Sequence, residues 1–437
     1  MMLRKIIVTG LFNRFNYEIN FDFEKNNNLL LLTAPNGFGK STILRIINFF
    51  FKKKFNALEK IHFEKIHFFI NDNEITVRKI TDGRFRTLDF RDNKGNNFIY
   101  NLKTRNQQIK REIIENSYPF LERISFQHWI DKRTNNILTN TQVEQDYASN
   151  LLDYKIENSY MENGEGEWLN KVIDSIVVDF ISTERLLDQQ SNNRLAVTEM
   201  ASTISDMIKN NIRQQFVISK RQESSFPQRV MKMLEEDRYV GVNEIAEKIN
   251  KLQKFNETYN KNEVFGPINL EQDVIEKLFS KEISQNKSFL LVLHEYISDA
   301  FNKTKKFENL AKKLDLFTSS INDLFIFKKI EITSEGGIIV KNDEGSTISL
   351  DSLSSGEQHL LIMIGKLIFE SHKNTLVLLD EPEISLHPAW QEEILKIFES
   401  IKKINNLNIL IATHSPSLIG ENWDAVIELA ELTEGKL

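Results

Sequence analysis

The sequence predicts an α/β fold with a mixed or parallel core sheet, an antiparallel β subdomain and an inserted helical arm. First, "LLLLTAPNGFGKSTILRIINFF" at Leu29–Phe50 has the pattern of a buried strand, a glycine-rich turn and a helix. Second, the chain after Ser352 alternates between helical and strand patterns, which is typical of a parallel sheet. Third, residues 191–327 are rich in Glu, Lys and Gln, poor in Gly and Pro, and apolar at helical spacing.

The composition indicates a chain long enough for more than one domain. Its 437 residues are 41% hydrophobic and 27% charged, with a formal net charge of −6. That charge argues against a wholly basic nucleic-acid binder but is compatible with a local basic patch. The chain has no cysteine, which excludes disulfides and thiolate metal sites. Because we find neither a signal-peptide pattern nor an apolar run of ~18–20 residues, we expect a cytoplasmic protein without membrane spans.

We expect three parts along the chain. Residues 1–190 would form an N-terminal lobe with the β subdomain, residues 191–327 the helical arm, and residues 328–437 a C-terminal lobe. In the arm, no heptad pattern lasts the three to four repeats that indicate a long coiled coil.

Local patterns predict the elements of the two lobes. The first lobe begins with two strands in "RKIIVTGLFNRFNYEINFDF" and continues with a helix at about Lys40–Phe51. A strand-rich zone follows, with hairpin turns at Asp82-Gly83 and Lys94-Gly95. The sequence then predicts mostly helix from Thr104 to Lys171, interrupted by "RISFQHWI", and a buried strand at Ile176–Ile181. In the last part, Gly336-Gly337 predicts another hairpin turn.

The glycine-rich turn after Leu32 resembles a phosphate-binding loop. Backbone N–H groups of such a turn, at a helix N-terminus, form a cradle for anions. Lys40 would reach the β- and γ-phosphates of a nucleotide, Ser41 would bind Mg²⁺, and Thr42 would add a hydroxyl near the α-phosphate.

One residue departs from the pattern G-x-x-x-x-G-K-[ST]. Ala34 stands where the first glycine is usual, at the entrance of the turn, and a methyl group is tolerable there if φ stays negative. Gly37 and Gly39 stand where the backbone must curl closely round a phosphate.

Two acidic residues follow a second buried strand. The run Leu376–Leu379 leads into Asp380 and Glu381, at the strand's C-terminal end, where ligands bind in open α/β sheets. Asp380 would hold Mg²⁺ directly or through water, and Glu381 would polarise the attacking water.

Two further patterns could sense a γ-phosphate. In "LSSGEQ", Ser354 resembles an N-cap, and the Ser-Gly stretch at Gly356 and Glu357 places N–H groups at a positive helix end. In "NILIATH", a buried strand ends at His414, whose ring could donate to a phosphate oxygen. By itself, either pattern also fits a capped helix or a satisfied polar residue.

Together, and in this order, the four patterns resemble the ATP-binding cassette (ABC) superfamily. Walker A would be Ala34–Thr42, the signature Leu353–Gln358, Walker B Leu376–Glu381, and the switch histidine His414. The resemblance implies an ABC-type P-loop NTPase with ATP and Mg²⁺ as cofactors. The residues that it implies around the nucleotide are Asn36, Gly37, Phe38, Gly39, Lys40, Ser41 and Thr42, with Ser354, Gly356 and Glu357 from the signature.

Two features resemble the RecF-, SMC- and OLD-like branch of this superfamily. The signature is far from Walker A in the sequence, and Walker B continues as "DEPEISLHP". By the resemblance, Asn13 and Arg14 in "LFNRFNYEINF" would lie near the nucleotide. The residue that serves the Q-loop stays open between Glu184 and Gln127.

The same resemblance suggests partners. OLD-like nucleases carry a Toprim domain after the cassette, and we expect none here because the sequence ends shortly after His414. The chain resembles the ATPase subunits of prokaryotic anti-phage systems of the Septu, retron-associated and PARIS types. This implies a separate effector nuclease, of the HNH or Toprim type.

In the superfamily, two chains sandwich ATP head to tail. The resemblance therefore implies a homodimer or a higher even-numbered homo-oligomer, with Ser354 and Gly356 of one chain facing Lys40 of the other.

Two alternatives stay open. Lysines in "FFKKKF" (Phe50–Phe55) and at Lys303–Lys313 would suit a repair ATPase that clamps DNA directly, or simply a solvated face. Ala34 is the one sequence reason to expect ATP binding with little turnover; because Lys40, Glu381 and His414 are present, we expect hydrolysis.

Overall fold

The computed structural model describes most of the chain. The described residues are 2–82, 85–101, 114, 117–118, 120–125, 128–133, 136–143, 166–182, 196–236, 240–259, 273–333, 337–384 and 386–433. They divide into two compact units. The first unit comprises Met1–Thr183, His372–Ile384 and Asn406–Leu437, and the second Glu184–Ser371 and Ser385–Asn405. The three-part division predicted from the sequence stays a prediction.

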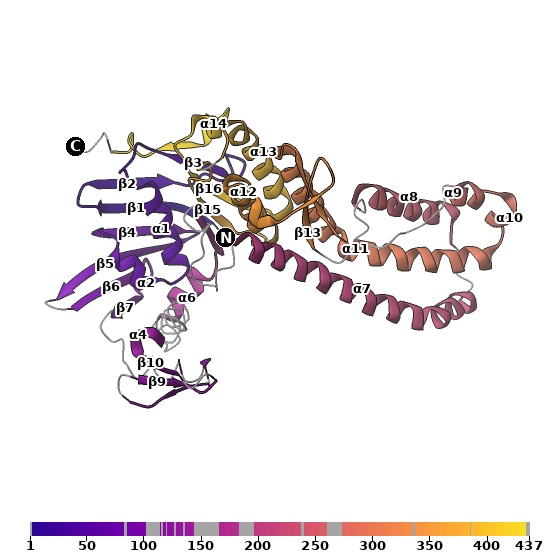
Figure 1. Ribbon diagram of the computed structural model, residues 1–437, viewed down its shortest axis with the longest axis horizontal. Coiled ribbons are helices and arrows are strands. Elements are labelled where there is room, and N and C mark those ends of the chain that lie inside the picture. The colour runs from indigo at the N-terminus through magenta and orange to yellow at the C-terminus, as the bar shows by residue number, and fades with distance from the viewer. Residues whose placement is uncertain are drawn as a thin grey trace. The chain divides into compact units, whose positions relative to one another are not determined.

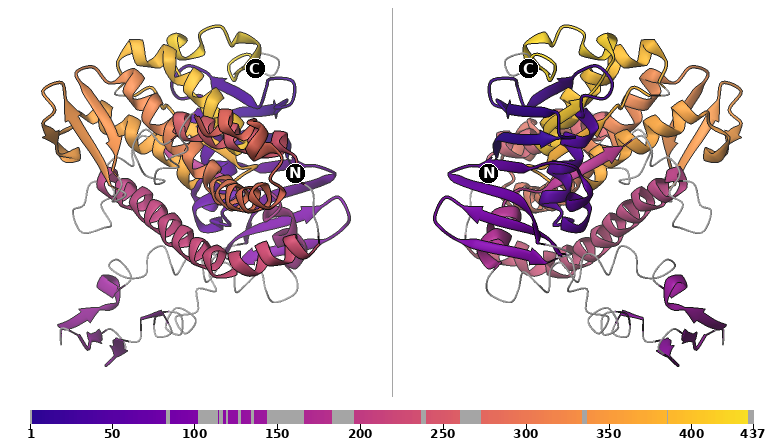
Figure 2. Two further views of the ribbon diagram at one scale, coloured as in Figure 1. Left: turned by 90° about the vertical axis from the view of Figure 1, so that its right-hand side faces the viewer. Right: turned by 90° about the vertical axis from the view of Figure 1, so that its left-hand side faces the viewer.

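The first unit contains a six-stranded antiparallel sheet in the order β2-β1-β4-β5-β6-β7 (Figure 1). Its strands are β1 (Leu3–Leu11), β2 (Phe15–Asn20), β4 (Lys65–Ile70), β5 (Asn73–Asp82), β6 (Phe85–Asp92) and β7 (Asn97–Asn101). Apolar and polar residues alternate in β2, so that Phe15, Tyr17 and Ile19 point into the core. Figure 2 shows these strands, in indigo and purple, from two further sides.

The hairpin predicted at Lys94-Gly95 is confirmed. It joins β6 to β7; Gly95 has a φ of +91°, and the Asp92 carboxylate accepts from the Lys94 and Asn96 amides. Asp82 pairs with Phe85 across the β5–β6 hairpin, whose Gly83 lies outside the described residues.

A five-stranded sheet in the same unit is parallel throughout, with the order β11-β15-β16-β3-β17. Its strands are β3 (Leu29–Thr33), β11 (Val178–Ser182), β15 (Leu376–Asp380), β16 (Asn408–Ala412) and β17 (Val426–Glu428). Every residue of β3 and β15 is buried, as continuous apolar runs in a parallel sheet require. This topology brings the ends of β15, β16 and β3 together at one edge.

Helix α1 (Lys40–Phe51) is buried in the core that the two sheets share. Its bounds match the predicted helix, and its apolar residues cover more than one face: Ile43, Leu44, Ile46, Ile47, Phe50 and Phe51. Phe50 stacks on Phe68 of β4 with 3.9 Å between ring centroids. The unit's short helices are α2 (Phe55–Lys60), α4 (Asn140–Val143), α6 (Glu167–Ile173), α14 (Pro416–Ile419) and the 3₁₀ turn η5 (Trp423–Ala425).

The expectation of mostly helix over Thr104–Lys171, interrupted by "RISFQHWI" (Arg123–Ile130), is wrong for the described residues at 121–122 and 136–139, which lie in strands outside the predicted interruption. Three short strands form an antiparallel sheet there: β8 (Leu121–Arg123), β9 (His128–Asp131) and β10 (Asn136–Thr139). Leu121 and Trp129 pack with Val143 in a small core of their own. Alternate burial along β9 has the period of a strand, but four residues are too few for periodicity to identify one.

The second unit contains the helical arm. Its helices are α7 (Ala196–Glu235), α8 (Val242–Tyr259), α9 (Asp273–Leu278), α10 (Lys281–Ser284) and α11 (Lys287–Leu324). Both α7 and α8 pack against α11 (Figure 1). Ile245, Ile249 and Leu252 of α8 are fully buried in an apolar cluster with Ile297 of α11.

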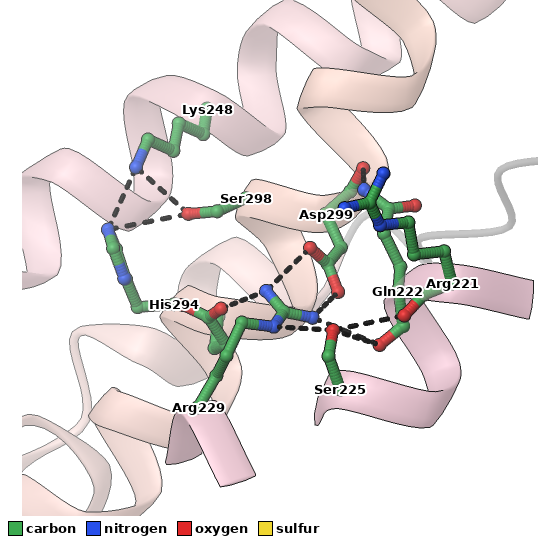
Figure 3. A network of polar contacts seen from close by, with 9 residues as sticks. Arg221, Gln222, Ser225, Arg229, Lys248, His294, Ser298 and Asp299 are labelled. Atoms are coloured by element: carbon green, nitrogen blue, oxygen red, sulfur yellow. Dashed lines mark hydrogen bonds and ion pairs between the residues drawn. The ribbon is translucent and has the colours of Figure 1, made fainter. Parts of the chain in front are cut away.

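Polar contacts also hold the arm helices together (Figure 3). Arg229 of α7 donates to Asp299, at 2.9 Å between Nη1 and Oδ1, and to Glu295, both on α11. Its Nη2 also donates to the Gln222 carbonyl, earlier in α7. Pro227 lies between these two residues and, because it has no N–H, interrupts the backbone hydrogen bonding of the helix. Lys248 of α8 lies 2.8 Å from His294 and 3.0 Å from Ser298.

The rest of the second unit is a small antiparallel sheet and three helical segments. They are β12 (Lys328–Ile332), β13 (Ile338–Asn342), β14 (Thr347–Ile348), the 3₁₀ turn η3 (Leu350–Ser352), α12 (Ser355–Gly365), the π-helical turn η4 (Lys366–Glu370) and α13 (Pro388–Asn405). The predicted hairpin between β12 and β13 is present; Gly337 is described and Gly336 is not. Gly365 allows α7 to approach closely, since a Cβ there would lie 2.7 Å from Met200 Sδ.

The predicted combination of a parallel core sheet, an antiparallel β subdomain and an inserted helical arm is confirmed. Among the described residues, no helix is both long and apolar enough to span a bilayer.

Candidate functional site

The loop between β3 and α1 has the backbone of a phosphate cradle. Gly37 and Gly39 have φ angles of +87° and +89°, which side chains with a Cβ rarely adopt. Gly39 also has little space, because a Cβ there would lie 3.0 Å from Leu11 Cδ2. Ala34 is buried and is not among the residues with positive φ, so its methyl group is tolerated at the entrance of the turn.

Residues of β2 and of the β1–β2 turn support this loop. The Tyr17 hydroxyl donates to the Phe38 carbonyl at 2.7 Å, and the rings of Phe15 and Phe38 lie 5.2 Å apart. Burial raises the pKa of Tyr17 to about 12, although the charge of Arg14 acts to lower it. The Tyr17 hydroxyl therefore stays protonated and donates at neutral pH.

The same turn contains Asn13 and Arg14. The Arg14 guanidinium lies 5.2 Å from the centroid of the Phe15 ring, and Asn13 Nδ2 lies 3.4 Å from His62 Nε2. Arg14 thus lies beside Phe15, whose ring contacts Phe38 of the loop, and Asn13 follows Phe12, whose ring lies beside Gly39. Their predicted contact with the nucleotide stays a prediction.

Lys40, the first residue of α1, is buried at 5% exposure. Its ammonium donates to the Ala34 carbonyl at 2.8 Å and lies 2.7 Å from His414 Nε2. Burial lowers the pKa of Lys40, while the nearby carboxylates of Glu381 and Asp380 act to raise it. A cation in this setting gains free energy from an added anion, so the site suits a phosphate.

His414 lies between Lys40 and Glu381. Its Nε2 is 2.7 Å from Lys40 Nζ and 3.0 Å from the Glu381 carboxylate. One ring nitrogen cannot accept from the lysine and donate to the glutamate at once. Because Lys40 Nζ also lies 3.3 Å from Nδ1, a ring that carries its proton on Nε2 can donate to Glu381 and still accept from Lys40.

Asp380 and Glu381 lie at the end of β15, as the sequence predicts. Glu381 has a φ of +51°, and its amide donates to the Ala412 carbonyl of β16 at 2.8 Å. A left-handed glutamate costs about 1 kcal/mol or more, and the neighbouring strand holds it there. The strained backbone directs its carboxylate toward His414.

The site offers oxygen ligands for a magnesium ion at the same edge. Ser41 is in the first turn of α1, and the buried Asp380 ends a strand of the same core. A hydroxyl and a carboxylate fit Mg²⁺, which usually completes its shell with phosphate and water. The described residues contain no group of three His, Asp or Glu side chains that could hold a metal without such help.

Glu383 is a site residue that the sequence alone did not suggest. Its Oε1 accepts from the Thr413 hydroxyl at 2.5 Å and from the His414 amide at 2.9 Å. Glu383 therefore fixes the backbone that carries His414. The second glutamate of "DEPE" was the available signal, but its partners follow the end of another strand, β16.

The signature residues belong to the second unit. Ser354 caps α12, and its hydroxyl accepts from the Glu357 amide at 3.3 Å. Glu357 accepts from the Ser354 amide at 2.8 Å and from Lys328 at 2.9 Å. Burial would raise the pKa of Glu357, but the hydrogen bonds from Lys328 and Ser354 outweigh it and lower that pKa. This capping box places the N–H groups around Gly356 at a positive helix end.

The structure thus brings Lys40, Asp380, Glu381 and His414 together within the first unit. Both candidates for the Q-loop, Glu184 and Gln127, lie outside the described residues.

The fold and the site define a nucleotide-binding protein of the P-loop ATPase class. A family model described as "AAA domain, putative AbiEii toxin, Type IV TA system" matches residues 32–420, which is most of the chain. The chain therefore belongs to this family of ATPase domains.

Known relatives are similar over shorter stretches. The chain is 38% identical over 79 residues to the energy-coupling factor transporter ATP-binding protein EcfA2 of Spiroplasma kunkelii, covering 18% of this chain and 25% of the relative. It is 26% identical over 172 residues to the Retron Vc95 probable ATPase of Vibrio cholerae serotype O1 biovar El Tor, covering 34% and 31%. It is 36% identical over 69 residues to protein ea59 of Escherichia phage lambda, covering 16% and 13%. The matches thus span less than a third of each relative's length.

Two solved structures align over nearly the whole chain with low scores. The Smc head domain of Pyrococcus furiosus, bound to a domain of ScpA, is 12% identical, with a TM-score of 0.36 over 98% of this chain and 92% of that one. The SMC head domain of Thermotoga maritima is 12% identical, with a TM-score of 0.33 over 98% and 94%.

Proposed function

We propose that the chain hydrolyses ATP with Mg²⁺ at the edge formed by β3, β15 and β16. The single observation that carries this proposal is the buried Lys40, linked through His414 to Glu381. Lys40 would neutralise the phosphates, Glu381 would polarise the attacking water, and His414 would sense the γ-phosphate. Mg²⁺, held by Ser41 and Asp380, would neutralise charge on the phosphate oxygens.

Steady-state turnover of wild type beside Glu381→Gln tests this function. The substitution keeps the size of the side chain and its contact with His414 but removes the base, so we expect turnover to fall by ~100-fold or more. Nucleotide binding should persist in the variant. Equal, near-zero rates for both proteins would refute the proposed hydrolysis.

The second half of the site would come from another copy. The residues predicted for Walker A and Walker B lie in the first unit and the predicted signature in the second, which is compatible with each chain carrying two half-sites. In a head-to-tail homodimer, or a larger even-numbered assembly, Ser354 and Gly356 of one chain would close over ATP bound by Lys40 of the other. ATP favours that dimer only as far as it binds the closed form better than the open one.

We further propose that this ATPase belongs to an anti-phage defence complex and controls a separate effector nuclease of the HNH or Toprim type. The family's description as a putative toxin of a toxin–antitoxin system and the similarity to a retron ATPase support it. Affinity purification from the native host, with and without ATP, tests it. Recovery of a nuclease is expected; purification of the ATPase alone in both conditions would contradict it.

Direct clamping of DNA is the second candidate. Some lysines of the clusters that favour it already pair with carboxylates of the same chain. Lys52 lies near Asp179, Lys53 pairs with Asp174, and Lys312 pairs with Glu308. Lys305 and Lys306 of α11 are exposed, and their ammonium groups could contact DNA phosphates. DNA affinity that falls steeply with salt would favour it, and weak affinity without salt dependence would reject it.

A further inference from the structure

Two large apolar side chains are exposed beside the signature helix. Ile326 and Phe327 follow the end of α11 and are 66% and 74% exposed. The next residue is Lys328, whose ammonium contacts both oxygens of Glu357 at 2.9 Å. Glu357 in turn accepts from Ser354. The apolar pair is therefore connected to the signature by one short series of contacts within the second unit.

The backbone around Ile326 and Phe327 is fixed in a conformation that leaves both side chains exposed to solvent. Phe327 has a φ of +62°, which is unusual for a bulky residue and costs free energy. The flanking segments are fixed on both sides, because the Asn322 side chain accepts from the Ile330 amide at 2.7 Å and donates to its carbonyl at 3.1 Å. The neighbouring hydrogen bonds thus hold Phe327 in a strained conformation in which its ring stays exposed.

The P-loop side of the first unit carries exposed apolar side chains of its own. Phe12 is 44% exposed, has a φ of +54°, and its ring lies 3.3 Å from where a Cβ of Gly39 would be. Ile384 is 45% exposed and follows Walker B, with its amide donating to the Glu381 carbonyl. Each half-site thus has large apolar side chains at its border.

We propose that Ile326 and Phe327 of one chain pack against Phe12 and Ile384 of a second copy when ATP closes the dimer. This rests on the proposed head-to-tail dimer, because placing a signature over a P-loop brings these two borders together. Exposed apolar residues beside a polar site make effective anchors, since burying them removes water from the edge of that site. The contact would make dimer closure depend on protein surface as well as on nucleotide.

Sedimentation velocity of Glu381→Gln with Mg²⁺ and ATP tests the proposal. In this background, Ile326→Ser with Phe327→Asn removes the apolar surface, and asparagine tolerates the left-handed backbone at residue 327. We expect the dimer's Kd to rise by ~30-fold or more, as for loss of an interface anchor. Phe216→Ser with Val217→Ser is the matched control, because these neighbours on α7 are 62% and 65% exposed, and its Kd should not change.

A double-mutant cycle separates contact from misfolding. Phe12→Asn and Phe327→Asn should each weaken the dimer, and their combination should weaken it less than the product of the two effects. A dimer as strong in the Ile326/Phe327 variant as in its parent would overturn this inference and leave the dimer intact. Absence of any ATP-dependent dimer in Glu381→Gln itself would instead refute the proposed assembly, and this inference with it.

Discussion

Replacing Glu383 with alanine tests whether His414, the proposed γ-phosphate sensor, is held from outside its own loop. The Glu383 carboxylate accepts from the Thr413 hydroxyl at 2.5 Å and from the His414 amide at 2.9 Å. Hydrogen bonds to a charged group contribute about 1.5–3 kcal/mol each. Because both bonds share one oxygen and are not additive, we expect Glu383→Ala to lower the free energy of unfolding by about 3–5 kcal/mol. Glu383→Gln keeps an acceptor oxygen, so it should cost only about 1–1.5 kcal/mol.

Turnover should follow the same order. His414 touches both Lys40 and Glu381, so a shift of its backbone by about 1 Å would slow hydrolysis by ~100-fold in Glu383→Ala. Glu383→Gln should retain most of the activity. Urea unfolding and steady-state ATP hydrolysis measure the two effects, with the exposed Glu421→Ala as control. Turnover and stability like wild type in Glu383→Ala would refute the positioning role.

Four other substitutions probe the loop, the signature, the β subdomain and the arm. Gly39→Ala should cost about 2–3 kcal/mol in urea unfolding, and Gly95→Ala less, because both have positive φ but only Gly39 is crowded. Glu357→Ala should cost about 2–3 kcal/mol, seen as faster amide exchange at the start of α12, because it removes a capping box and leaves a lysine partner unpaired. Burial lowers the pKa of His67 below 6.5 in the folded chain, so the unfolded chain binds a proton at higher pH than the folded chain does. The stability that depends on neutral His67 should be complete above pH 6.5 and fall as the pH drops through that value. In urea unfolding measured against pH, His67→Gln should lack this part of the loss of stability in acid. Arg229→Met should cost about 2–3 kcal/mol of local stability, read from amide exchange where α7 meets α11, because two half-buried carboxylates lose their shared cation.

Local patterns predicted well the strands and the helix that carry the candidate site. The bounds of α1 match, because the glycine-rich turn before the helix and its run of apolar residues are both visible in the sequence. The buried strands that end at Asp380 and near His414 were also visible, since parallel core strands are continuous apolar runs.

Other features depend on contacts that the sequence does not show. Glu383 acts through Thr413 and His414, which follow a different strand. The strands within 121–139 are too short for periodicity to distinguish them from helix. The sequence predicted several helices over residues 191–327 but not the lengths of the two long ones, α7 and α11. Pro227 would usually end a helix, but the contacts of Arg229 support the chain through it.

Mixing two inactive variants tests most directly the claim that the ATP site is shared between two chains. Lys40→Ala removes the P-loop cation and leaves the signature intact, whereas Ser354→Arg blocks the signature and leaves the P-loop intact. Each variant alone should hydrolyse no ATP. Mixed together, they should regain part of the wild-type turnover, because one of the two sites in each mixed dimer combines an intact P-loop with an intact signature. A mixture as inactive as its components, although Glu381→Gln still dimerises with ATP, would contradict the claim.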